Sequence, residues 1–453
     1  KDYQCNPGDR VVIYSKNSLE YLLAMQAIWW IGCVASPVNY RLHPKELEWV
    51  LEDTEAKLVI TADGNLQKSI HLEQCKEFAL SDLNIDELLL ETSQIEPPCR
   101  AELDDLAWLF YTSGTTGRPK GVMLTHQNLM AMSLCVPIDV HPINHDDAIY
   151  YAAPLSHGAG LYNFIFTRVG AKHVFPKSGG FDEAELIHTA KTIKNLCFFA
   201  APTILKRLTQ FAEKHQYFGE GIKMIICGGA PLYVADYLAS EKQLGSIISQ
   251  IYGQGESPMT ITAISQNDLK LKTPEEKLAY IQTVGTTHSC VQLRVVDEHM
   301  NDLPLGQNGE IIVKGLAVMK GYWNNPRATE DTLVDGWLKT GDIGNLNSNG
   351  CLTLTDRSKD VIISGGSNVY PREVEEALLH HPAVEEVSVV GVEDEAWGEV
   401  VTAHLVMKSD QLIDENELKD WCKSLIAGFK VPKKYFFYEE LPKSSYGKII
   451  NAK

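Results

Sequence analysis

One short stretch, the segment Tyr111–Gly121, constrains the chain more than any other. It reads YTSGTTGRPKG and follows the apolar run Leu106–Tyr111. Its glycines allow positive φ and close backbone approach, so successive N–H groups can point at one anion while serine and threonine hydroxyls add donors. Lys120 adds a positive charge. A flexible linker rich in serine and glycine would not need the apolar run, which is typical of a buried strand. The stretch therefore predicts a strand that leads into a phosphate-holding loop.

Several other catalytic motifs are excluded by the residues themselves. A Walker A loop starting at Gly114 would need its second glycine where the chain has Pro119. The pattern of a dinucleotide-binding loop that starts at Gly253 ends on Pro258 instead of glycine. The chain contains neither the G-x-S-x-G elbow of serine hydrolases nor the H-E-x-x-H motif of zinc proteases.

Hydrophobic periodicity indicates the fold class. Expected strands alternate with helical patterns in the first half of the chain, which is typical of layered α/β structure. The strands are Arg10–Tyr14, Lys57–Thr61, Ala148–Ala153, Ala171–Phe175 and Lys223–Cys227, and the helices are Ser18–Ile31 and Phe181–Ile193. We expect the first helix to start with the capping pair Asn17 and Glu20 and to stop near Gly32.

The pattern changes beyond about Val284 to hairpin-like strands, which indicates a β-rich subdomain. These strands are Gln292–Val296 and Glu310–Lys314, with a turn at Asn301–Gly306 between them. After Asp356 a smaller α+β piece follows. Its expected elements are the strands Asp360–Ile363, Val384–Val392 and Val400–Met407 and the helices Arg372–His380 and Asp414–Ser424.

Composition restricts the class of protein. The chain has 453 residues, 44% hydrophobic and 22% charged, which suggests a globular protein of two or three lobes. A net charge of −18 argues against a general affinity for nucleic acid or anionic membranes. The ten cysteines form no C-x-x-C pair, so a reduced, cytoplasmic location is expected and a structural zinc is not. The longest apolar segment, Leu22–Val38, is too short and too interrupted to span a membrane.

The chain closely resembles the acyl-adenylate-forming superfamily, whose members include acyl-CoA synthetases, aryl-CoA ligases, luciferases and peptide-synthetase adenylation domains. The resemblance begins with the loop at Tyr111–Gly121 and continues in order along nearly the whole chain. Its further motifs are Gly228–Leu232, Tyr252–Glu256, Gly321–Pro326, Gly336–Asp342, Asp356–Asp360, Ser364–Gly366 and Pro442–Lys448. It implies a large N-terminal region of layered α/β sheets with a β-rich subdomain, residues 1–356, and a hinge at residues 357–360. A small mobile α+β C-terminal domain would comprise residues 361–453. Compared with the family pattern, the first few dozen residues are expected to be missing.

The resemblance implies that ATP is a substrate. The implied ATP-binding residues are Ser113, Gly114, Thr115, Thr116, Gly117, Lys120, Gly228, Gly229, Ala230, Pro231, Tyr252, Gly253, Gln254, Gly255, Asp342 and Arg357. Asp342 would accept hydrogen bonds from the ribose hydroxyls, as acidic residues do in dinucleotide folds. Gly228–Pro231 and Tyr252 would enclose adenine, although the former also reads as an ordinary turn after a strand. The family usually has threonine where this chain has Gly255.

Four residues carry the catalytic roles that the resemblance implies. Lys448 would bridge the carboxylate and the α-phosphate, and Glu256 would be the oxygen ligand of a phosphate-bound Mg²⁺. Lys359 would be the pivot of the hinge, and His157 would gate access between acyl group and nucleotide. Each has a plainer alternative. Lys448 could be a solvated tail lysine and Glu256 an exposed loop acid. Lys359 could be an exposed linker charge and His157 a structural histidine.

The second half-reaction would bring coenzyme A to Ser364, Gly365 and Gly366 through rotation of the C-terminal domain. The implied acyl pocket consists of His157, Ala200, Ala201, Gly229 and Met259. No acidic residue follows His157 closely, so an ammonium would be buried without a partner there, and a fatty or aryl carboxylic acid is favoured. Two alternatives stay open: an adenylating enzyme that loads a carrier-protein phosphopantetheine, and a nucleotide sensor without turnover. A homodimer is also left open.

Overall fold

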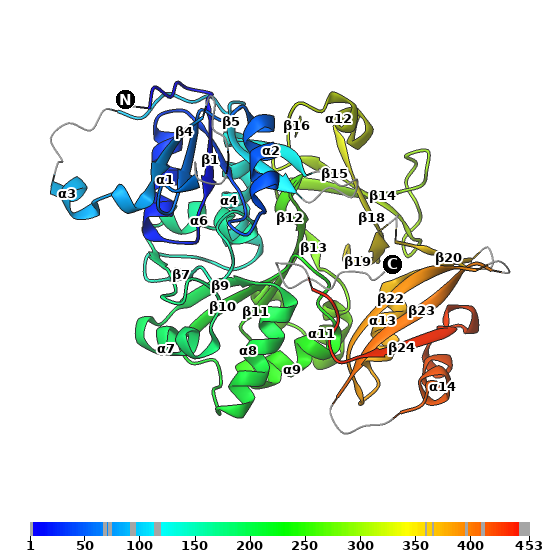
Figure 1. Ribbon diagram of the computed structural model, residues 1–453. Helices are drawn as coiled ribbons and strands as arrows, with labels where there is room; N and C mark the ends of the chain where they lie inside the picture. The colour runs from blue at the N-terminus through cyan, green and yellow to red at the C-terminus, as the bar shows by residue number, and fades with distance from the viewer. Residues whose placement is uncertain are drawn as a thin grey trace.

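The computed structural model describes residues 3–66, 70, 75–90, 97–112, 119–357, 360–364, 367–394, 397–408 and 413–443. Four sheets organise this part of the chain (Figure 1). Two sheets have seven strands each, and the other two have five each. Within the described residues, no helix is both long enough and apolar enough to cross a membrane.

The first sheet has the strand order β16-β6-β5-β2-β1-β3-β4. Its strands are β1 Arg10–Tyr14, β2 Val34–Pro37, β3 Leu58–Thr61, β4 Lys76–Ala79, β5 Leu106–Thr112, β6 Lys120–Thr125 and β16 Gly321–Tyr322. Strands β2, β1, β3 and β4 run parallel, whereas β5 and β6 form an antiparallel pair in which Thr112 lies opposite Lys120. The expected strand before the loop is therefore present, and the loop connects it to β6.

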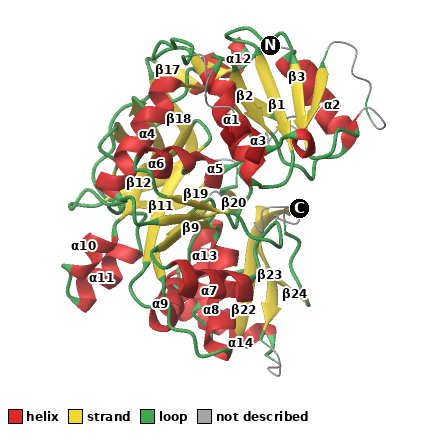
Figure 2. Ribbon diagram, turned by 90° about the vertical axis from the view of Figure 1, so that its left-hand side faces the viewer, coloured by secondary structure: helices red, strands yellow, loops and turns green. Residues whose placement is uncertain are grey.

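The second sheet has the order β13-β12-β11-β10-β9-β7-β8. Its strands are β7 Ala148–Tyr150, β8 Lys172–Val174, β9 Leu196–Ala200, β10 Ile222–Cys227, β11 Ile248–Gln254, β12 Ser257–Ile264 and β13 Thr286–Thr287. Strands β7 to β11 run parallel, and all but the edge strand β8 are largely buried, since helices cover the sheet (Figure 2). The tight antiparallel turn from β11 to β12 carries Gln254 and Glu256.

The third sheet is the β-rich subdomain that the sequence predicted. Its strands are β14 Val291–Val296, β15 Gly309–Gly315, β17 Leu333–Val334, β18 Trp337–Leu346 and β19 Leu352–Arg357. The fourth sheet has its own core and consists of β20 Ile362–Ser364, β21 Ser367–Val369, β22 Val384–Asp394, β23 Gly398–Met407 and β24 Lys434–Tyr438. It lies beside the rest of the chain in orange and red in Figure 1.

Helices pack around all four sheets. They are α1 Leu19–Trp30, α2 Pro44–Thr54, α3 Ile85–Leu90, α4 His126–Asp139, α5 Gly158–Leu161, α6 Asn163–Arg168, α7 Glu183–Ile193, α8 Pro202–Lys214, α9 Val234–Leu244, α10 Gln266–Lys270, α11 Pro274–Ile281, α12 Pro326–Thr332, α13 Pro371–Leu379 and α14 Glu415–Leu425. The predicted α/β class with a β-rich subdomain and a smaller α+β part is confirmed.

The predicted capping pair of the first helix is wrong. Ser18, not Asn17, is the N-cap of α1, and its hydroxyl accepts a hydrogen bond from the Tyr21 N–H. Asn17 instead donates to the carbonyl oxygens of Tyr151 and Ala153, at 3.1 and 2.8 Å. A contact with a distant loop has replaced the local cap, because a buried carbonyl needs a donor wherever the chain can supply one.

Candidate active site

Lys120 and Glu256 both contact one aromatic side chain, Tyr322. The Lys120 ammonium lies 4.8 Å from the centre of the Tyr322 ring, and the Tyr322 hydroxyl donates to Glu256 Oε1 at 2.7 Å. Glu256 is half-buried, so the plainer alternative of an exposed loop acid does not describe it. Ser113, Gly114, Thr115, Thr116 and Gly117 lie outside the described residues. The start of β6, just after them, nevertheless brings Lys120 close to Glu256, the carboxylate predicted to bind metal.

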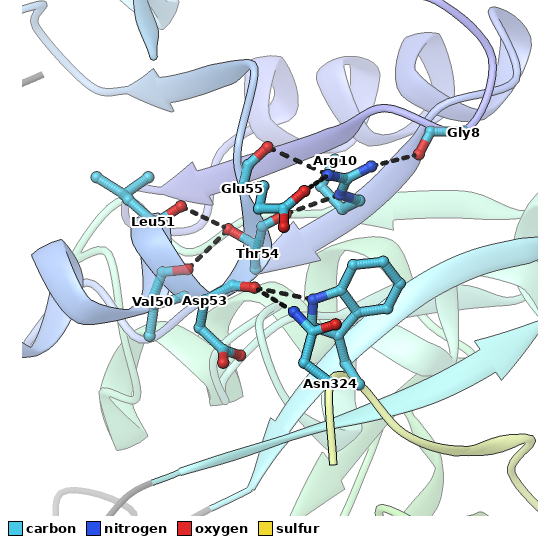
Figure 3. A network of polar contacts seen from close by, with 9 residues as sticks. Gly8, Arg10, Val50, Leu51, Asp53, Thr54, Glu55 and Asn324 are labelled. Carbon is cyan, nitrogen blue, oxygen red and sulfur yellow. Dashed lines mark hydrogen bonds and ion pairs between the residues drawn. The ribbon is translucent and has the colours of Figure 1, made fainter. Parts of the chain in front are cut away.

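Tyr322 is held in place by the next two residues, which bind to helix α2. Trp323 Nε1 and Asn324 Nδ2, just after Tyr322, both donate to the Asp53 carbonyl oxygen, at 2.8 and 3.3 Å. Figure 3 shows this carbonyl at the end of α2, where Arg10 also donates to the Thr54 carbonyl. The segment with Tyr322 is therefore anchored to a rigid element, which is how precise sites are built.

Asp342 on β18 accepts hydrogen bonds from side chains of β11. Asp342 Oδ2 accepts hydrogen bonds from Tyr252 Oη and from Gln254 Nε2, each at 2.6 Å. Gln254 also donates to the Thr340 carbonyl at 2.9 Å. Asp342 is 7% exposed. A buried carboxylate is costly without such donors, and these contacts orient it. Three of the predicted nucleotide-binding residues are thus in direct contact.

A cavity of about 280 Å³ lies next to this cluster. Among its lining residues are eight that the sequence predicted: Ala201, Gly229, Ala230, Pro231, Tyr252, Gly253, Gln254 and Asp342. Gly228 lies directly behind the lining, where a Cβ would come within 2.6 Å of Ile251 Cδ1, so this position has no room for a side chain. The cavity therefore has a glycine-lined wall and a carboxylate, which suits a base and a ribose.

Gly255 is explained by crowding. A Cβ on it would lie 2.6 Å from Thr112 Cγ2 and 3.1 Å from Phe110 Cδ1. The threonine usual in the family would therefore require Thr112 to rotate. In this chain a glycine lets the turn pack directly against the end of β5.

His157 faces apolar rings. It makes an edge contact with Phe110, with ring centres 5.6 Å apart, and its Nδ1 lies 3.1 Å from the Ser156 hydroxyl. A Cβ on the next residue, Gly158, would meet Met259 and Phe199. Gly229 also faces Phe199, so His157, Met259 and Gly229 surround one region. Ala201 lines the cavity, whereas Ala200 is fully buried on β9 in the core of the second sheet.

Burial lowers the pKa of His157 from 6.5 to about 4. Between these two values the unfolded chain binds more protons, so the free energy of unfolding falls as the pH falls through this range. We expect acidification from pH 7 to pH 5 to cost about 2 kcal/mol through His157 alone. His157→Gln should therefore lose less in unfolding midpoint over this interval than the wild type. His173, whose pKa burial also lowers to about 4, contributes equally in both proteins.

The control for this pH experiment is His145→Gln, because the His145 side chain is 76% exposed. That variant should lose as much on acidification as the wild type. An identical pH dependence in His157→Gln and the wild type would contradict burial as the cause of the lowered pKa.

The predicted C-terminal residues are only partly described. Ser364 ends β20 and is buried, and Arg357 ends β19, where its backbone pairs with Asp342. Lys359, Gly365, Gly366 and Lys448 lie outside the described residues.

Polar contacts join the fourth sheet to the helices of the second. The Tyr233 hydroxyl, just before α9, donates to Glu375 Oε2 on α13 at 2.7 Å, and Lys206 on α8 donates to the Glu385 carbonyl at 2.7 Å. The other Glu375 oxygen accepts from the Val389 N–H at 2.9 Å. Arg372, Glu375 and Ser388 extend the cavity lining on this side. The candidate site therefore lies where the two parts of the chain meet.

The Tyr233–Glu375 contact gives a prediction for this interface. A hydrogen bond to a carboxylate contributes about 1.5–3 kcal/mol, so Tyr233→Phe should weaken docking of the fourth sheet about tenfold. Trypsin should then cut faster after Arg357 or Lys359, which limited proteolysis with mass spectrometry would measure. Tyr14→Phe is the matched control, because Tyr14 on β1 donates to the Leu42 carbonyl, which lies between β2 and α2. Equal cleavage rates in all three proteins would show that this contact does not hold the interface.

Comparison with known proteins gives the family. The model of the AMP-binding enzyme family matches residues 2–323, and that of the AMP-binding enzyme C-terminal domain matches residues 373–448. The chain belongs to the AMP-binding enzymes. Among similar proteins are a feruloyl-CoA synthase of Amycolatopsis, 33% identical over 98% of this chain and 88% of that protein, and a long-chain-fatty-acid–CoA ligase of Bacillus subtilis, 32% identical over 99% and 86%. A solved o-succinylbenzoate CoA synthetase of Bacillus subtilis, in complex with its acyl-adenylate intermediate, is 31% identical with a TM-score of 0.84, over 99% of this chain and 88% of that one.

The predicted membership of the acyl-adenylate-forming superfamily is confirmed. The sequence of this AMP-binding enzyme had not predicted a role at the site for Tyr322, Phe110 or Phe199. Tyr322 stood within a motif that carried the resemblance but had no assigned role. Phe110 and Phe199 had no local signal, since each belongs to an apolar run that reads only as a buried strand.

Proposed function

We propose that the chain is an ATP-dependent acid–thiol ligase, an AMP-forming acyl-CoA synthetase. A fatty or aryl carboxylic acid is activated as acyl-AMP with release of pyrophosphate, and the acyl group is then transferred to coenzyme A. The observation that carries the proposal is the contact of Asp342 with Tyr252 and Gln254 beside a glycine-lined cavity in an AMP-binding enzyme. The names of the relatives, which are CoA synthases and ligases, support the same reaction class.

The first half-reaction is an attack of the acid's carboxylate oxygen on the α-phosphorus of ATP. The bond to pyrophosphate breaks as the new phosphorus–oxygen bond forms. A carboxylate is already ionised at neutral pH, so no general base is needed. Alignment of two anions and stabilisation of the developing charge are the demands on the protein. Asp342 and the wall at Gly229–Pro231 would position the nucleoside, while Lys120 and Lys448 would stabilise phosphate charge.

Magnesium suits the donors on the phosphate side. Glu256 presents a half-buried carboxylate that Tyr322 orients through a single oxygen, so ligand capacity remains on the carboxylate. One carboxylate together with substrate phosphates is the usual protein share of a Mg²⁺ site. The residues therefore fit the ion, and Glu256 would hold it. When bound, the ion would neutralise phosphate charge.

The second half-reaction needs a different arrangement, because Lys448 must leave the nucleotide before a thiol can reach the acyl carbon. The thiol sulfur would attack that carbon, and AMP would leave. We place the hinge at residues 357–360, with Lys359 as the pivot between residues 1–356 and 361–453. Ser364, Gly365 and Gly366 would then border the path of coenzyme A. The contacts of Tyr233 and Lys206 with the fourth sheet would hold one of the two arrangements.

The surroundings of His157 favour an uncharged acyl group. Phe110 lies beside its ring, and Phe199 and Met259 lie beside the next residue, Gly158. All three are apolar, and the lowered pKa of His157 keeps this side chain neutral at pH 7. An ammonium would find no opposite charge among these neighbours. The chain is about equally identical in sequence to a feruloyl-CoA synthase and to a long-chain-fatty-acid–CoA ligase. The choice between an aryl acid and a fatty acid as substrate is therefore left to experiment.

Pyrophosphate release across a panel of acids tests the proposal. Cinnamates, benzoates and straight chains of graded length should be offered with ATP and Mg²⁺, first without and then with coenzyme A or a carrier protein. We expect release with at least one apolar acid, and a thioester only when a thiol is present. A thioester formed on the carrier protein alone would favour the carrier-loading alternative. Nucleotide binding without any pyrophosphate release would contradict the proposal.

A further inference from the structure

One face of α4 contacts segments of the β-rich subdomain from the first turn of the helix to its last residue. Asn128 Nδ2 donates to the carbonyl oxygens of Leu316 and Val318, both at 2.8 Å. Ala131 lies in the core of the third sheet. At the far end, Asp139 accepts from the Ser289 N–H at 2.9 Å and from the Ser289 hydroxyl at 2.6 Å. A helical spacing of three or four residues places these side chains on one stripe.

Cys135 occupies the remaining position of that stripe, one turn before Asp139. Its thiol interacts with the thiol of Cys290, the residue next to Ser289, and the hydrogen bonds between Ser289 and Asp139 hold the two segments together. The backbone on both sides of this pair is fixed, since the Cys290 carbonyl accepts from the Leu316 N–H at 3.1 Å. Cys135 is buried, whereas Cys290 is partly exposed, and neither forms a disulfide in this structure. Two thiols from segments far apart in sequence are thus held together by rigid neighbours.

We propose that Cys135 and Cys290 form an oxidative modification site, a dithiol that a peroxide converts into a disulfide. The geometry assigns the roles, because a peroxide reaches the partly exposed Cys290 first and the buried Cys135 stands directly behind it. Redox-sensitive cysteines have this arrangement of an accessible thiol beside a resolving thiol.

The two steps balance as follows. The Cys290 thiolate attacks one oxygen of hydrogen peroxide, the O–O bond breaks, and a sulfenic acid and water result after proton transfer. The Cys135 sulfur then attacks the sulfenic sulfur, the S–O bond breaks, and a second water leaves. Two thiols and one peroxide thus yield one disulfide and two waters. The electronic setting agrees with these roles, since the interaction with Cys135 lowers the pKa of Cys290, while the same interaction and burial raise the pKa of Cys135.

The chain contains a second thiol contact that serves as an internal control. The thiol of Cys5 interacts with the thiol of Cys33 near the first sheet. Burial raises the pKa of both thiols there, so neither offers much thiolate at neutral pH. We therefore expect Cys135–Cys290 to oxidise well before Cys5–Cys33, although both pairs are in contact.

The test is peptide mapping of the whole protein after brief treatment with equimolar hydrogen peroxide. A peptide pair linked through Cys135 and Cys290, lighter by two hydrogen atoms than the reduced pair, should appear first and vanish on reduction with dithiothreitol. The cross-link closes a long loop and should raise the unfolding midpoint by several degrees. Neither change should occur in Cys290→Ser, whereas Cys33→Ser should behave as the wild type.

Three results would overturn the site. One is a sulfenic or sulfinic acid on Cys290 with no linked peptide, and another is linkage of Cys5 to Cys33 before Cys135 to Cys290. The third is an unfolding midpoint that rises equally in Cys290→Ser. Because the first two are read on the wild-type chain, the outcome does not depend on how well a variant folds.

Discussion

Replacement of Lys448 by alanine is expected to lower the rate of pyrophosphate release about a thousandfold, since loss of one donor to a transition-state charge typically costs 10²–10³. Thioester synthesis from supplied acyl-AMP should change only a few-fold, because the proposed role of Lys448 ends when AMP has been transferred. The two half-reactions can be measured separately, with pyrophosphate release for the first and coenzyme A consumption for the second.

A matched lysine controls for general damage to the C-terminal part. Lys443 forms an ion pair with Glu386 at 2.7 Å, and Lys443→Ala should leave both half-reactions within about threefold of the wild type, as for a partly exposed ion pair. Lys359→Pro should show the opposite pattern to Lys448→Ala, because proline restricts φ at the proposed pivot and hinders the rotation that thioester synthesis needs. Equal loss of both half-reactions in Lys448→Ala and Lys359→Pro would contradict the scheme of two arrangements.

The sequence predicted most of the framework for local reasons. An apolar run before a glycine-rich segment predicted β5, and the change to hairpin patterns after Val284 predicted the third sheet. The resemblance named Asp342, Tyr252 and Gln254 as members of one site, and the structure brings them into contact. Sequence spacing alone could not have predicted this contact, because no local pattern in β11 indicates that β18 lies beside its end.

Contacts between distant segments were out of reach for the same reason. Asn17 satisfied a capping rule, yet its amide donates to carbonyl oxygens beyond β7, and Ser18 is the cap. Cys135 and Cys290 looked like isolated thiols because their partnership depends on how α4 packs against the third sheet. In each case a tertiary contact, which sequence patterns predict poorly, replaced the local role that the sequence indicated for the side chain.

Asp342→Asn is expected to lower kcat/KM for ATP about a hundredfold, mainly through KM. The amide keeps the size of the side chain but removes the charge that the Tyr252 hydroxyl and the Gln254 amide orient from β11. It would also place an N–H among donors, and loss of a charged hydrogen-bond partner in a buried site costs about 2–3 kcal/mol. The KM of the acid should stay unchanged, since Phe110 and Met259, not Asp342, lie beside the proposed acyl group.

Two further variants make this result specific. Asp302→Asn removes a carboxylate from the same subdomain, where Asp302 pairs with Arg294 and is 70% exposed, and it should leave ATP kinetics unchanged. Tyr252→Phe keeps the Asp342 charge but removes one of its donors, so a loss of about five- to tenfold is expected, as for one hydrogen bond. The loss of ATP binding should decrease in the order Asp342→Asn, Tyr252→Phe, Asp302→Asn. This order should appear both in the KM for ATP and in the ATP-induced shift of the unfolding midpoint. An Asp342→Asn enzyme that binds ATP like the wild type would place the ribose elsewhere and remove the basis of the proposed site.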